Sequence, residues 1–298
     1  MKYVLYNPLS DNSSGADNAR ELLVKYPSDK YVFLDITSLS DEQIFELLEK
    51  DDGDVILSGG DGTLNRFANT VSGRVTDKPI YYYPTGTGND FKVDVLGKTG
   101  KELILLNDYI STLPEINVKG KSYKFINGVG YGIDGYSCEV VDKKKKQDGK
   151  HGNYVLAAFK GLMYAYDAGK AVITVDGVTR EFEDVWMVSA MNGKYFGGGV
   201  MIAPMQDRMN PEHTVSVIVV TAKKRINILM AFPSIFKGKH LKYTDMVKVF
   251  TGKQISVKLD RPSPLQIDGD VFSGVTEYTV TAYGAENTEL KEKTEETV

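Results

Sequence analysis

The stretch LSGGDGTLN at 57–65 constrains the fold more than any other part of the sequence. It places three glycines and one aspartate directly behind the apolar run Val55–Leu57, and the pattern predicts a helix that begins at Thr63. A turn that only reverses the chain needs one or two residues that tolerate positive φ, so this loop holds more glycine than reversal requires. Small residues after a buried strand let backbone N–H groups converge at a helix N-terminus, which favours a phosphate site. A strand-to-helix turn capped by Asp61 is the structural alternative.

A second loop of the same character, PTGTGND at 84–90, follows the next apolar run, Ile80–Tyr83. Two loops that present donors at one edge of a sheet favour a shared phosphate site. A turn in which Asn89 or Asp90 caps a short helix is the alternative. Asp61 in the first loop would repel phosphate unless a cation lay between them, so the loops also predict a magnesium ion.

The first third of the chain alternates short apolar runs with amphipathic helical segments. The predicted strands are Lys2–Tyr6, Tyr31–Ile36, Val55–Leu57 and Ile80–Tyr83. A polar loop at Asn7–Ser14 leads into a predicted helix at Ala16–Lys25. A capping box at Ser40–Gln43 opens a second predicted helix, which runs through Lys50. Strands separated by helices of this length predict βαβ units and a mostly parallel sheet. Ligands of such sheets bind beyond the carboxyl ends of strands, where both glycine loops lie.

From about residue 115 the pattern changes to alternating apolar runs separated by tight turns. Tight turns are predicted within Val118–Ser122, within Val175–Val178 and at Asp268-Gly269. Further strands are predicted at Gln254–Leu259, Leu265–Ile267 and Tyr278–Ala282. Helical inserts are predicted at Gly152–Ala165 and Arg225–Phe236. We therefore expect an α/β domain over 1–114, an antiparallel β-rich domain over 115–284, and a charged tail without periodicity over 285–298.

Composition excludes several classes of protein. A formal net charge of −4 gives no electrostatic case for binding nucleic acid. The single cysteine, Cys138, excludes an intramolecular disulfide framework and indicates a reducing compartment, the cytosol. The N-terminus lacks the apolar region of a signal peptide, and no segment approaches the ~18 apolar residues of a membrane span. Any membrane contact should therefore be peripheral.

Six motifs, in order, resemble those of the diacylglycerol kinase catalytic family, which includes bacterial soluble lipid kinases and the sphingosine and ceramide kinases. They are Asn7-Pro8 with Ser14-Gly15, Gly59–Asn65, Pro84–Phe91, Gly130–Asp134, Gly197–Gly199 ahead of Ala203-Pro204, and Asp268–Asp270. The resemblance implies an α/β first domain and a β-sandwich second domain, with nucleotide and substrate in the cleft between them. It also implies transfer of the γ-phosphoryl group of ATP, with Mg²⁺, to the hydroxyl of diacylglycerol or a similar lipid alcohol. Such an enzyme would work in the cytoplasm, with transient contact at the inner face of the membrane.

The resemblance also assigns roles to individual residues. The residues that would hold the ATP phosphates are Gly59, Gly60, Asp61, Gly62, Thr63, Leu64 and Asn65, and those that would line the rest of the nucleotide site are Thr37, Thr87 and Asn89. Asp61 would act on magnesium and the phosphates, and Asp134 would support the hydrogen bonds that join the domains. Asp270 would be the general base that takes the proton from the lipid hydroxyl.

Two departures from the family pattern stand out. Asp270 replaces the usual glutamate and is shorter by one C–C bond, ~1.5 Å, and misplacement on that scale can cost ~10²-fold in rate. Within 205–216, Glu212-His213 stands where the family shows the Asp-Gly of a structural magnesium site. Because a hard cation prefers oxygen ligands, we expect Glu212 with the carbonyls of Met209 and Thr214 to be the corresponding metal set in this chain.

These departures leave other functions open. One is a nucleotide-binding regulatory protein of the same fold with weak or no turnover. Another is an NAD kinase-like enzyme or a phosphofructokinase, since both share the GGDG motif.

The histidines His151, His213 and His240 lack ligand spacing, so we expect no zinc. Ile226–Lys242 is expected to pack in the core of the second domain, with a membrane-touching face as the alternative.

Overall fold

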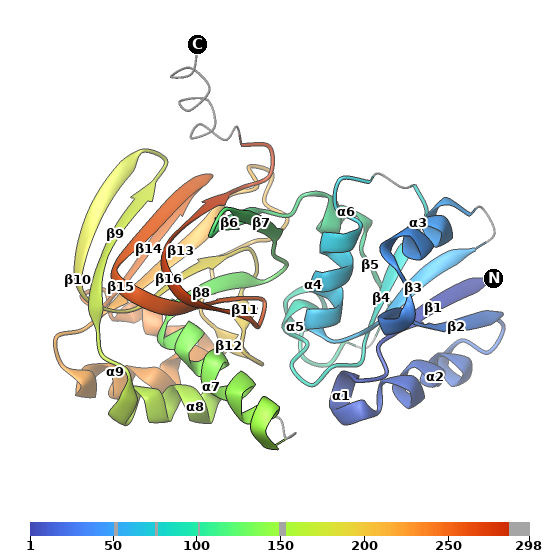
Figure 1. Ribbon diagram of the computed structural model, residues 1–298, viewed down its shortest axis with the longest axis horizontal. Coiled ribbons are helices and arrows are strands. Elements are labelled where there is room, and N and C mark those ends of the chain that lie inside the picture. The colour runs from blue at the N-terminus through green and yellow to red at the C-terminus, as the bar shows by residue number, and fades with distance from the viewer. Residues whose placement is uncertain (51–52, 75–76, 101, 149–152, 286–298) are drawn as a thin grey trace, which may run out of the picture. The chain divides into compact units, whose positions relative to one another are not determined.

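The computed structural model describes residues 1–50, 53–74, 77–100, 102–148 and 153–285, which form two compact units (Figure 1). Unit 1 combines Met1–Ser111 with the later segment Tyr195–Val200, and unit 2 combines Thr112–Lys194 with the chain from Met201 onward. Unit 1 is α/β with a mostly parallel sheet and unit 2 is antiparallel and β-rich, so the predicted fold class is confirmed. The predicted domain limits at residues 114 and 284 remain a prediction, and the predicted tail lies outside the described residues from 286 on.

The sheet of unit 1 has the strand order β2-β1-β3-β4-β5. Its strands are β1 (Lys2–Tyr6), β2 (Tyr31–Asp35), β3 (Asp54–Gly59), β4 (Ile80–Pro84) and β5 (Ile104–Leu105). The first four run parallel, and β5 runs antiparallel to β4. Val4 pairs with Phe33 on one side and Ile56 on the other, and both Val4 and Ile56 are fully buried. The apolar runs of the sequence form strands because helices cover them.

Short helices connect these strands. They are α1 (Ser10–Ser13), α2 (Gly15–Lys25), the 3-10 turn η1 (Ile36–Ser38), α3 (Asp41–Glu49), α4 (Asp61–Thr70), α5 (Asp90–Leu96) and α6 (Asn107–Ser111). The predicted capping box is confirmed, since Ser40 Oγ accepts from Gln43 N at 3.3 Å and Gln43 Oε1 accepts from Ser40 N at 2.9 Å. Two expectations were wrong: the predicted loop before Gly15 contains one helical turn, and α4 begins at Asp61 and not at Thr63 because the extended Gly60 is its N-cap.

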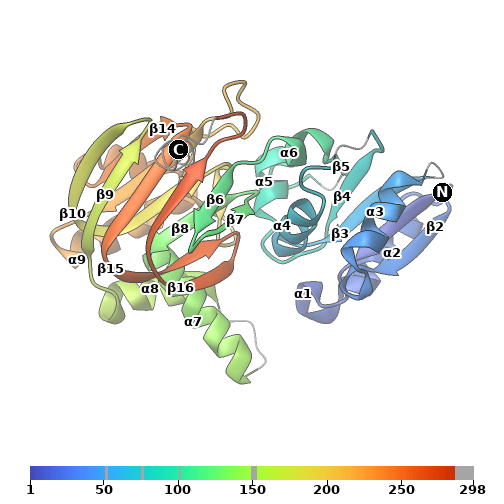
Figure 2. The same ribbon diagram turned by 45° about the horizontal axis from the view of Figure 1, so that its top comes forward.

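Unit 2 contains a nine-stranded sheet whose neighbouring strands run antiparallel (Figure 2). Its strands are β6 (Glu115–Val118), β7 (Lys121–Lys124), β8 (Gly128–Gly132), β9 (Gly169–Val175), β10 (Val178–Met191), β13 (Val215–Thr221), β14 (Val247–Gly252), β15 (Gln254–Ile267) and β16 (Asp270–Thr281), while β11 (Tyr195–Phe196) pairs with β12 (Val200–Met201). The three predicted tight turns are confirmed, with both central residues at positive φ, as in Asp268 (45°) and Gly269 (98°). The segments predicted as two strands between 254 and 267 form one irregular strand.

The helices of unit 2 lie below its strands in Figure 1. They are α7 (Ile133–Asp148), α8 (Tyr154–Lys160), the π-turn η2 (Gly161–Ala165), α9 (Arg225–Ala231) and the 3-10 turns η3 (Phe232–Lys237) and η4 (Lys239–Lys242). The sequence patterns missed α7. Among the residues that the structure describes, none of the helices combines the length and apolarity that crossing a bilayer requires.

Candidate functional site

The two glycine loops of unit 1 pass each other backbone to backbone. A Cβ on Gly86 would lie 2.4 Å from the Cα of Gly60, and a Cβ on Gly59 would lie 2.6 Å from the Cβ of Thr63. The N–H of Thr85 donates to the Gly59 carbonyl at 2.9 Å. A Cβ on Gly60 would lie 3.2 Å from the Cα of Gly86. Glycine at 59, 60 and 86 is therefore explained by close packing.

Gly62 is different, because a Cβ at this position would meet no atom within 4 Å. Gly62 lies in the first turn of α4, where alanine would stabilise the helix by up to ~1 kcal/mol relative to glycine. Neither packing nor a positive φ requires glycine here. The open space in front of Gly62 is available to a ligand, at the helix end where backbone N–H groups and the helix dipole favour an anion.

Asp61 joins the two loops through its carboxylate. Oδ2 accepts from Asp90 N at 2.8 Å and Oδ1 accepts from Phe91 N at 3.0 Å, so Asp61 caps the N-terminus of α5. The sequence suggested a cation as the reason for a carboxylate among the glycines. The structure supplies a further reason, because these charge-assisted hydrogen bonds fix α5 against the first turn of α4.

Asp90 extends this linkage to the later part of the chain within unit 1. Its side chain is 5% exposed, and its two oxygens accept from Gly198 N at 2.8 Å and Gly199 N at 2.7 Å. Gly198 and Gly199 have φ of 80° and 112°, a conformation that favours glycine. The glycine run at 197–199 is thus held beside the two loops, and sequence reasoning did not single out Asp90 as the residue that holds it.

A small cavity in unit 1 brings together several of the predicted nucleotide residues. Thr37, Gly62 and Thr63 line it together with Asn7 and Arg66. Asn7 Nδ2 donates to Thr63 Oγ1 at 2.9 Å, which places the Asn-Pro motif at the same spot. Sequence reasoning missed the exposed Arg66, although its position four residues after Gly62 puts it on the same helix face.

The other predicted nucleotide residues have structural partners. Leu64 is fully buried and Asn65 is 6% exposed, so both side chains belong to the interior of unit 1. Asn89 has a φ of 51° and its side chain accepts from Gly86 N, which closes the second loop. Thr87 Oγ1 donates to Asp11 Oδ1 at 3.2 Å. Their contact with nucleotide remains a prediction.

In unit 2, the turn at 268–270 is anchored on both sides of Gly269. The carboxylate of Asp268 accepts from the backbone N–H groups of Ile126, Asn127 and Gly128 at 2.5–2.9 Å. Gln266 Oε1 accepts from Gly269 N at 2.8 Å. These bonds fix the backbone at the start of β16, where the exposed Asp270 is the first residue.

Asp134 lies at the base of this arrangement and is 1% exposed. Its Oδ2 accepts from Gln266 Nε2 at 3.0 Å and its Oδ1 accepts from Tyr154 Oη at 2.5 Å. A Cβ on Gly130 would lie 1.3 Å from Oδ2, so the Gly130–Asp134 motif makes room for the carboxylate. Asp134 thereby connects through Gln266 to the turn that carries Asp270. Neither Gln266 nor Tyr154 was predicted.

We expect Asp134→Asn to change the pH dependence of stability. Burial raises the pKa of Asp134 from 3.8 to about 6, although the bonds from Tyr154 and Gln266 lower it. The folded protein therefore binds this proton more tightly than the unfolded chain, so the parent loses stability as pH rises from about 4 to above 6. The unfolding free energy of the variant relative to the parent should increase by about 2–3 kcal/mol between pH 4 and pH 7. Urea unfolding at both pH values measures this, with the exposed Asp245→Asn as control, and a difference independent of pH would contradict it.

The predicted metal set at 209–214 is surrounded by other partners. The Thr214 carbonyl accepts from Gln206 Nε2 at 3.0 Å and Asn210 Nδ2 at 3.2 Å. The Glu212 carboxylate pairs with Lys253 Nζ at 3.1 Å, and Met209 is 44% exposed. Binding of a cation by Glu212 with the carbonyls of Met209 and Thr214 remains a prediction.

His213 and His240 have partners among the described residues. His240 is 3% exposed with Nε2 2.9 Å from the Ile202 carbonyl, and burial lowers its pKa. The ring of His213 contacts that of Tyr283 at 5.2 Å between centroids. His151 lies outside the described residues. Over the described chain, no group of three or more His, Cys, Asp or Glu could hold a metal ion.

Two family models and several known proteins match this chain. Residues 2–111 match the family model of the diacylglycerol kinase catalytic domain, and residues 127–282 match that of the YegS C-terminal NAD kinase beta sandwich-like domain. A Bacillus subtilis protein named "Putative lipid kinase YtlR" is 27% identical over 242 residues, covering 73% of this chain and 74% of that protein. A Mycobacterium tuberculosis protein named "Diacylglycerol kinase" is 25% identical over 225 residues, covering 72% and 70%.

A solved structure shares the fold. It is described as "Crystal structure of a putative diacylglycerol kinase from Bacillus anthracis str. Sterne", and it matches with a TM-score of 0.66 at 19% identity, covering 94% of this chain and 91% of that chain.

Proposed function

This chain belongs to the diacylglycerol kinase catalytic domain family, and from that premise we propose that it is an ATP-dependent kinase of diacylglycerol or a similar lipid alcohol. The family supports a lipid kinase, and the relative named "Diacylglycerol kinase" supports the choice of substrate. We propose nucleotide binding by residues 1–114 and lipid binding by residues 115–284. We further propose that the protein acts in the cytoplasm and contacts the inner face of the membrane transiently.

The observation that carries nucleotide binding is the open space at Gly62. Gly62 lies in the first turn of α4, where backbone N–H groups have no partner within the helix, and Thr37, Thr63 and Arg66 line the cavity beside it. Backbone donors, a helix dipole and a guanidinium together suit a polyphosphate. Gly60 and Gly86 allow the two loops to approach each other closely, and Gly59 allows the first turn of α4 to pack against the end of β3.

The residues of unit 1 fit a magnesium ion that arrives with the nucleotide. The Asp61 carboxylate lies at the start of α4 beside the glycine loops, and carboxylate oxygens are the ligands that Mg²⁺ prefers. Mg²⁺ is commonly held by one or two carboxylates together with substrate phosphates and water. When bound, the ion would neutralise charge on the transferring phosphoryl group.

Asp270 supplies the general base in this proposal. It would take the proton from the lipid hydroxyl as the hydroxyl oxygen bonds to the γ-phosphorus and the bond to the bridging oxygen breaks, which releases ADP. The hydrogen bonds of Asp268 and Gln266 would hold the turn so that the shorter aspartate keeps one position. Asp134 would be a positioning residue, acting through Gln266.

Incubation with labelled ATP, magnesium and a total lipid extract tests the function. We expect label in an organic-extractable product whose mass identifies a phosphorylated lipid alcohol. NAD and fructose 6-phosphate serve as competing acceptors, and label in either would favour the corresponding soluble-substrate kinase. Calorimetric binding of ATP without transfer to any acceptor would favour the nucleotide-binding regulatory protein suggested by Asp270.

A further inference from the structure

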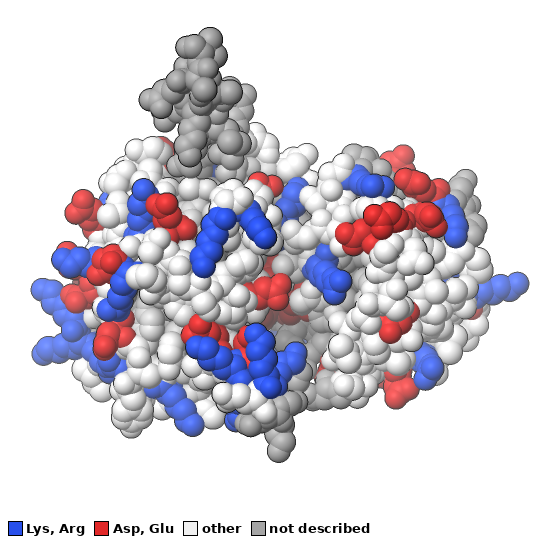
Figure 3. Space-filling model, viewed as in Figure 1, with Lys and Arg blue, Asp and Glu red and all other residues white. Residues whose placement is uncertain are grey.

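Two segments of unit 2 are strongly cationic although the whole chain is acidic. Residues 153–165 and 222–242 contain six lysines and one arginine and no aspartate or glutamate, in a chain whose formal net charge is −4. The residues are Lys160, Lys223, Lys224, Arg225, Lys237, Lys239 and Lys242. All six lysines are exposed. Figure 3 shows Lys and Arg side chains along the lower edge of unit 2, where α8 and α9 lie in Figure 1.

The same two segments expose large apolar side chains. Their exposed fractions are 51% for Leu156, 43% for Phe159, 80% for Tyr164, 54% for Ile226 and 68% for Met230. Ile226 and Met230 are four residues apart on α9 and therefore share a helix face. The expectation that Ile226–Lys242 packs in the core holds for Ile228, which is 7% exposed, and is wrong for Ile226 and Met230.

Aromatic contacts make these segments one continuous surface. The ring of Phe159 on α8 lies 6.3 Å from that of Phe232 at the end of α9, and Phe232 lies 5.8 Å from Phe236. We call the surface formed by these five exposed apolar residues and six lysines the α8–α9 face. Exposed aromatic and aliphatic side chains together with lysines are the composition of helices that lie in a membrane interface.

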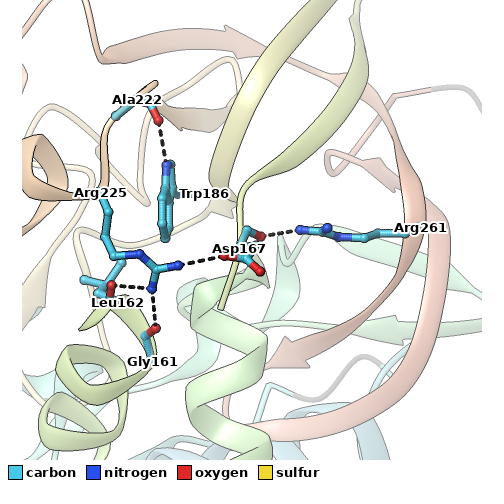
Figure 4. A network of polar contacts seen from close by, with 7 residues as sticks. All are labelled: Gly161, Leu162, Asp167, Trp186, Ala222, Arg225 and Arg261. Carbon is cyan, nitrogen blue, oxygen red and sulfur yellow. Dashed lines mark hydrogen bonds and ion pairs between the residues drawn. The ribbon is translucent and has the colours of Figure 1, made fainter. Parts of the chain in front are cut away.

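Arg225 links the two segments through hydrogen bonds and a ring contact (Figure 4). Its guanidinium donates to the Leu162 carbonyl at 2.8 Å and to Asp167 Oδ1 at 2.7 Å, and it lies 5.2 Å from the centre of the Trp186 ring. Trp186 donates in turn to the Ala222 carbonyl at 2.9 Å. The start of α9 is thereby fixed against η2, so the exposed apolar residues are presented without further folding.

We infer that the α8–α9 face docks unit 2 onto a bilayer that contains anionic lipid. The inference deepens the proposed function and rests on it, since a kinase of a lipid alcohol must reach a substrate that stays in the membrane. Charge complementarity identifies the occupant. The two segments carry six lysines and no carboxylate, and the neighbouring Asp167 is paired with Arg225. The surface therefore complements anionic headgroups and repels a second copy of itself in an isologous contact. The apolar residues then enter the headgroup boundary, so charge and apolar burial together hold the protein.

Sedimentation of the full chain with vesicles tests the inference. Parent protein should bind vesicles of phosphatidylcholine and phosphatidylglycerol in equal parts at least ~10-fold more tightly than vesicles of phosphatidylcholine alone, and added salt should weaken binding. Lys223→Glu with Lys224→Glu should weaken it at least ~30-fold. Phe159→Ser with Met230→Ser should weaken it at least ~10-fold, because apolar burial is lost.

Matched variants on α2 of unit 1 and in the segment that follows it control for charge and for folding. Lys25→Glu with Lys30→Glu changes the net charge equally, and Leu23→Ser with Val24→Ser replaces side chains that are 47% and 85% exposed. Controls that weaken binding as much as the α8–α9 variants would overturn the inference. So would equal affinity for both vesicle types, or a self-association that only the α8–α9 variants abolish while their vesicle binding persists.

The single tryptophan gives a second readout that needs no activity. Trp186 is 4% exposed and lies beneath Arg225, so anionic vesicles should shift its emission in the parent and not in the α8–α9 variants. Turnover of a water-soluble short-chain diacylglycerol separates this inference from the proposed function. Vesicle binding without such turnover would overturn the function and support the docking face. Turnover without vesicle binding would support the proposed function and overturn the docking face.

Discussion

Asp61→Ala should reduce lipid phosphorylation below detection and lower the unfolding free energy of the protein by about 3–6 kcal/mol. The carboxylate makes two charge-assisted hydrogen bonds to the N-terminus of α5, at 2.8 and 3.0 Å, and each such bond contributes about 1.5–3 kcal/mol. Without them, α5 and the attached Asp90 lose their fixed position beside the glycine loops. A displacement near 1 Å of groups that hold the phosphates is enough for a ~100-fold loss.

Two measurements distinguish this structural role from a role in metal binding alone. If Asp61 holds the loops, Asp61→Asn keeps only one acceptor oxygen, and its ADP affinity should fall both with and without magnesium. Calorimetric titration of ADP under both conditions measures this, and urea unfolding measures the loss of stability. Asp17→Ala on the exposed surface of α2 is the control. A variant with unchanged stability that loses ADP affinity only with magnesium present would contradict the structural role.

The parallel sheet and the tight turns could be predicted because their causes are local. Apolar runs such as Val55–Leu57 are buried between helices, and a pair such as Asp176-Gly177 takes positive φ at both turn positions. Helix α7 could not be predicted in this way. A Cβ on Gly135 in its first turn would lie 2.1 Å from the Pro264 carbonyl, so a residue that weakens the helix is required there by packing against β15.

The candidate site was predictable in its motifs and not in its connections. The glycine loops were recognisable from composition, since both follow apolar runs. Asp61 bonds to a residue 29 positions later and Asp90 to one 108 positions later, and no local pattern reports such pairs. The role of Gln266 is also tertiary, because its amide joins a buried carboxylate to a backbone N–H of the turn.

Asp270→Asn should lower kcat by ~10²–10⁴-fold, the usual contribution of a general base, and should leave the affinity for ADP unchanged. An amide cannot take the proton of the lipid hydroxyl, whereas the turn that positions it is anchored by Asp268 and Gln266 and should stay intact. Initial rates with mixed-micelle diacylglycerol and calorimetry with ADP measure the two quantities. The exposed Asp245→Asn is the control.

Asp270→Glu sharpens this test because it restores the residue type that is usual in the family. Glutamate keeps a titratable carboxylate and moves it by ~1.5 Å, so kcat should stay within ~10²-fold of the parent and above that of Asp270→Asn. If the asparagine and glutamate variants were equally slow, position would matter more than proton transfer. If the asparagine variant kept the parent rate, Asp270 would not be the base. Another group of the chain would then have to accept the proton of the lipid hydroxyl.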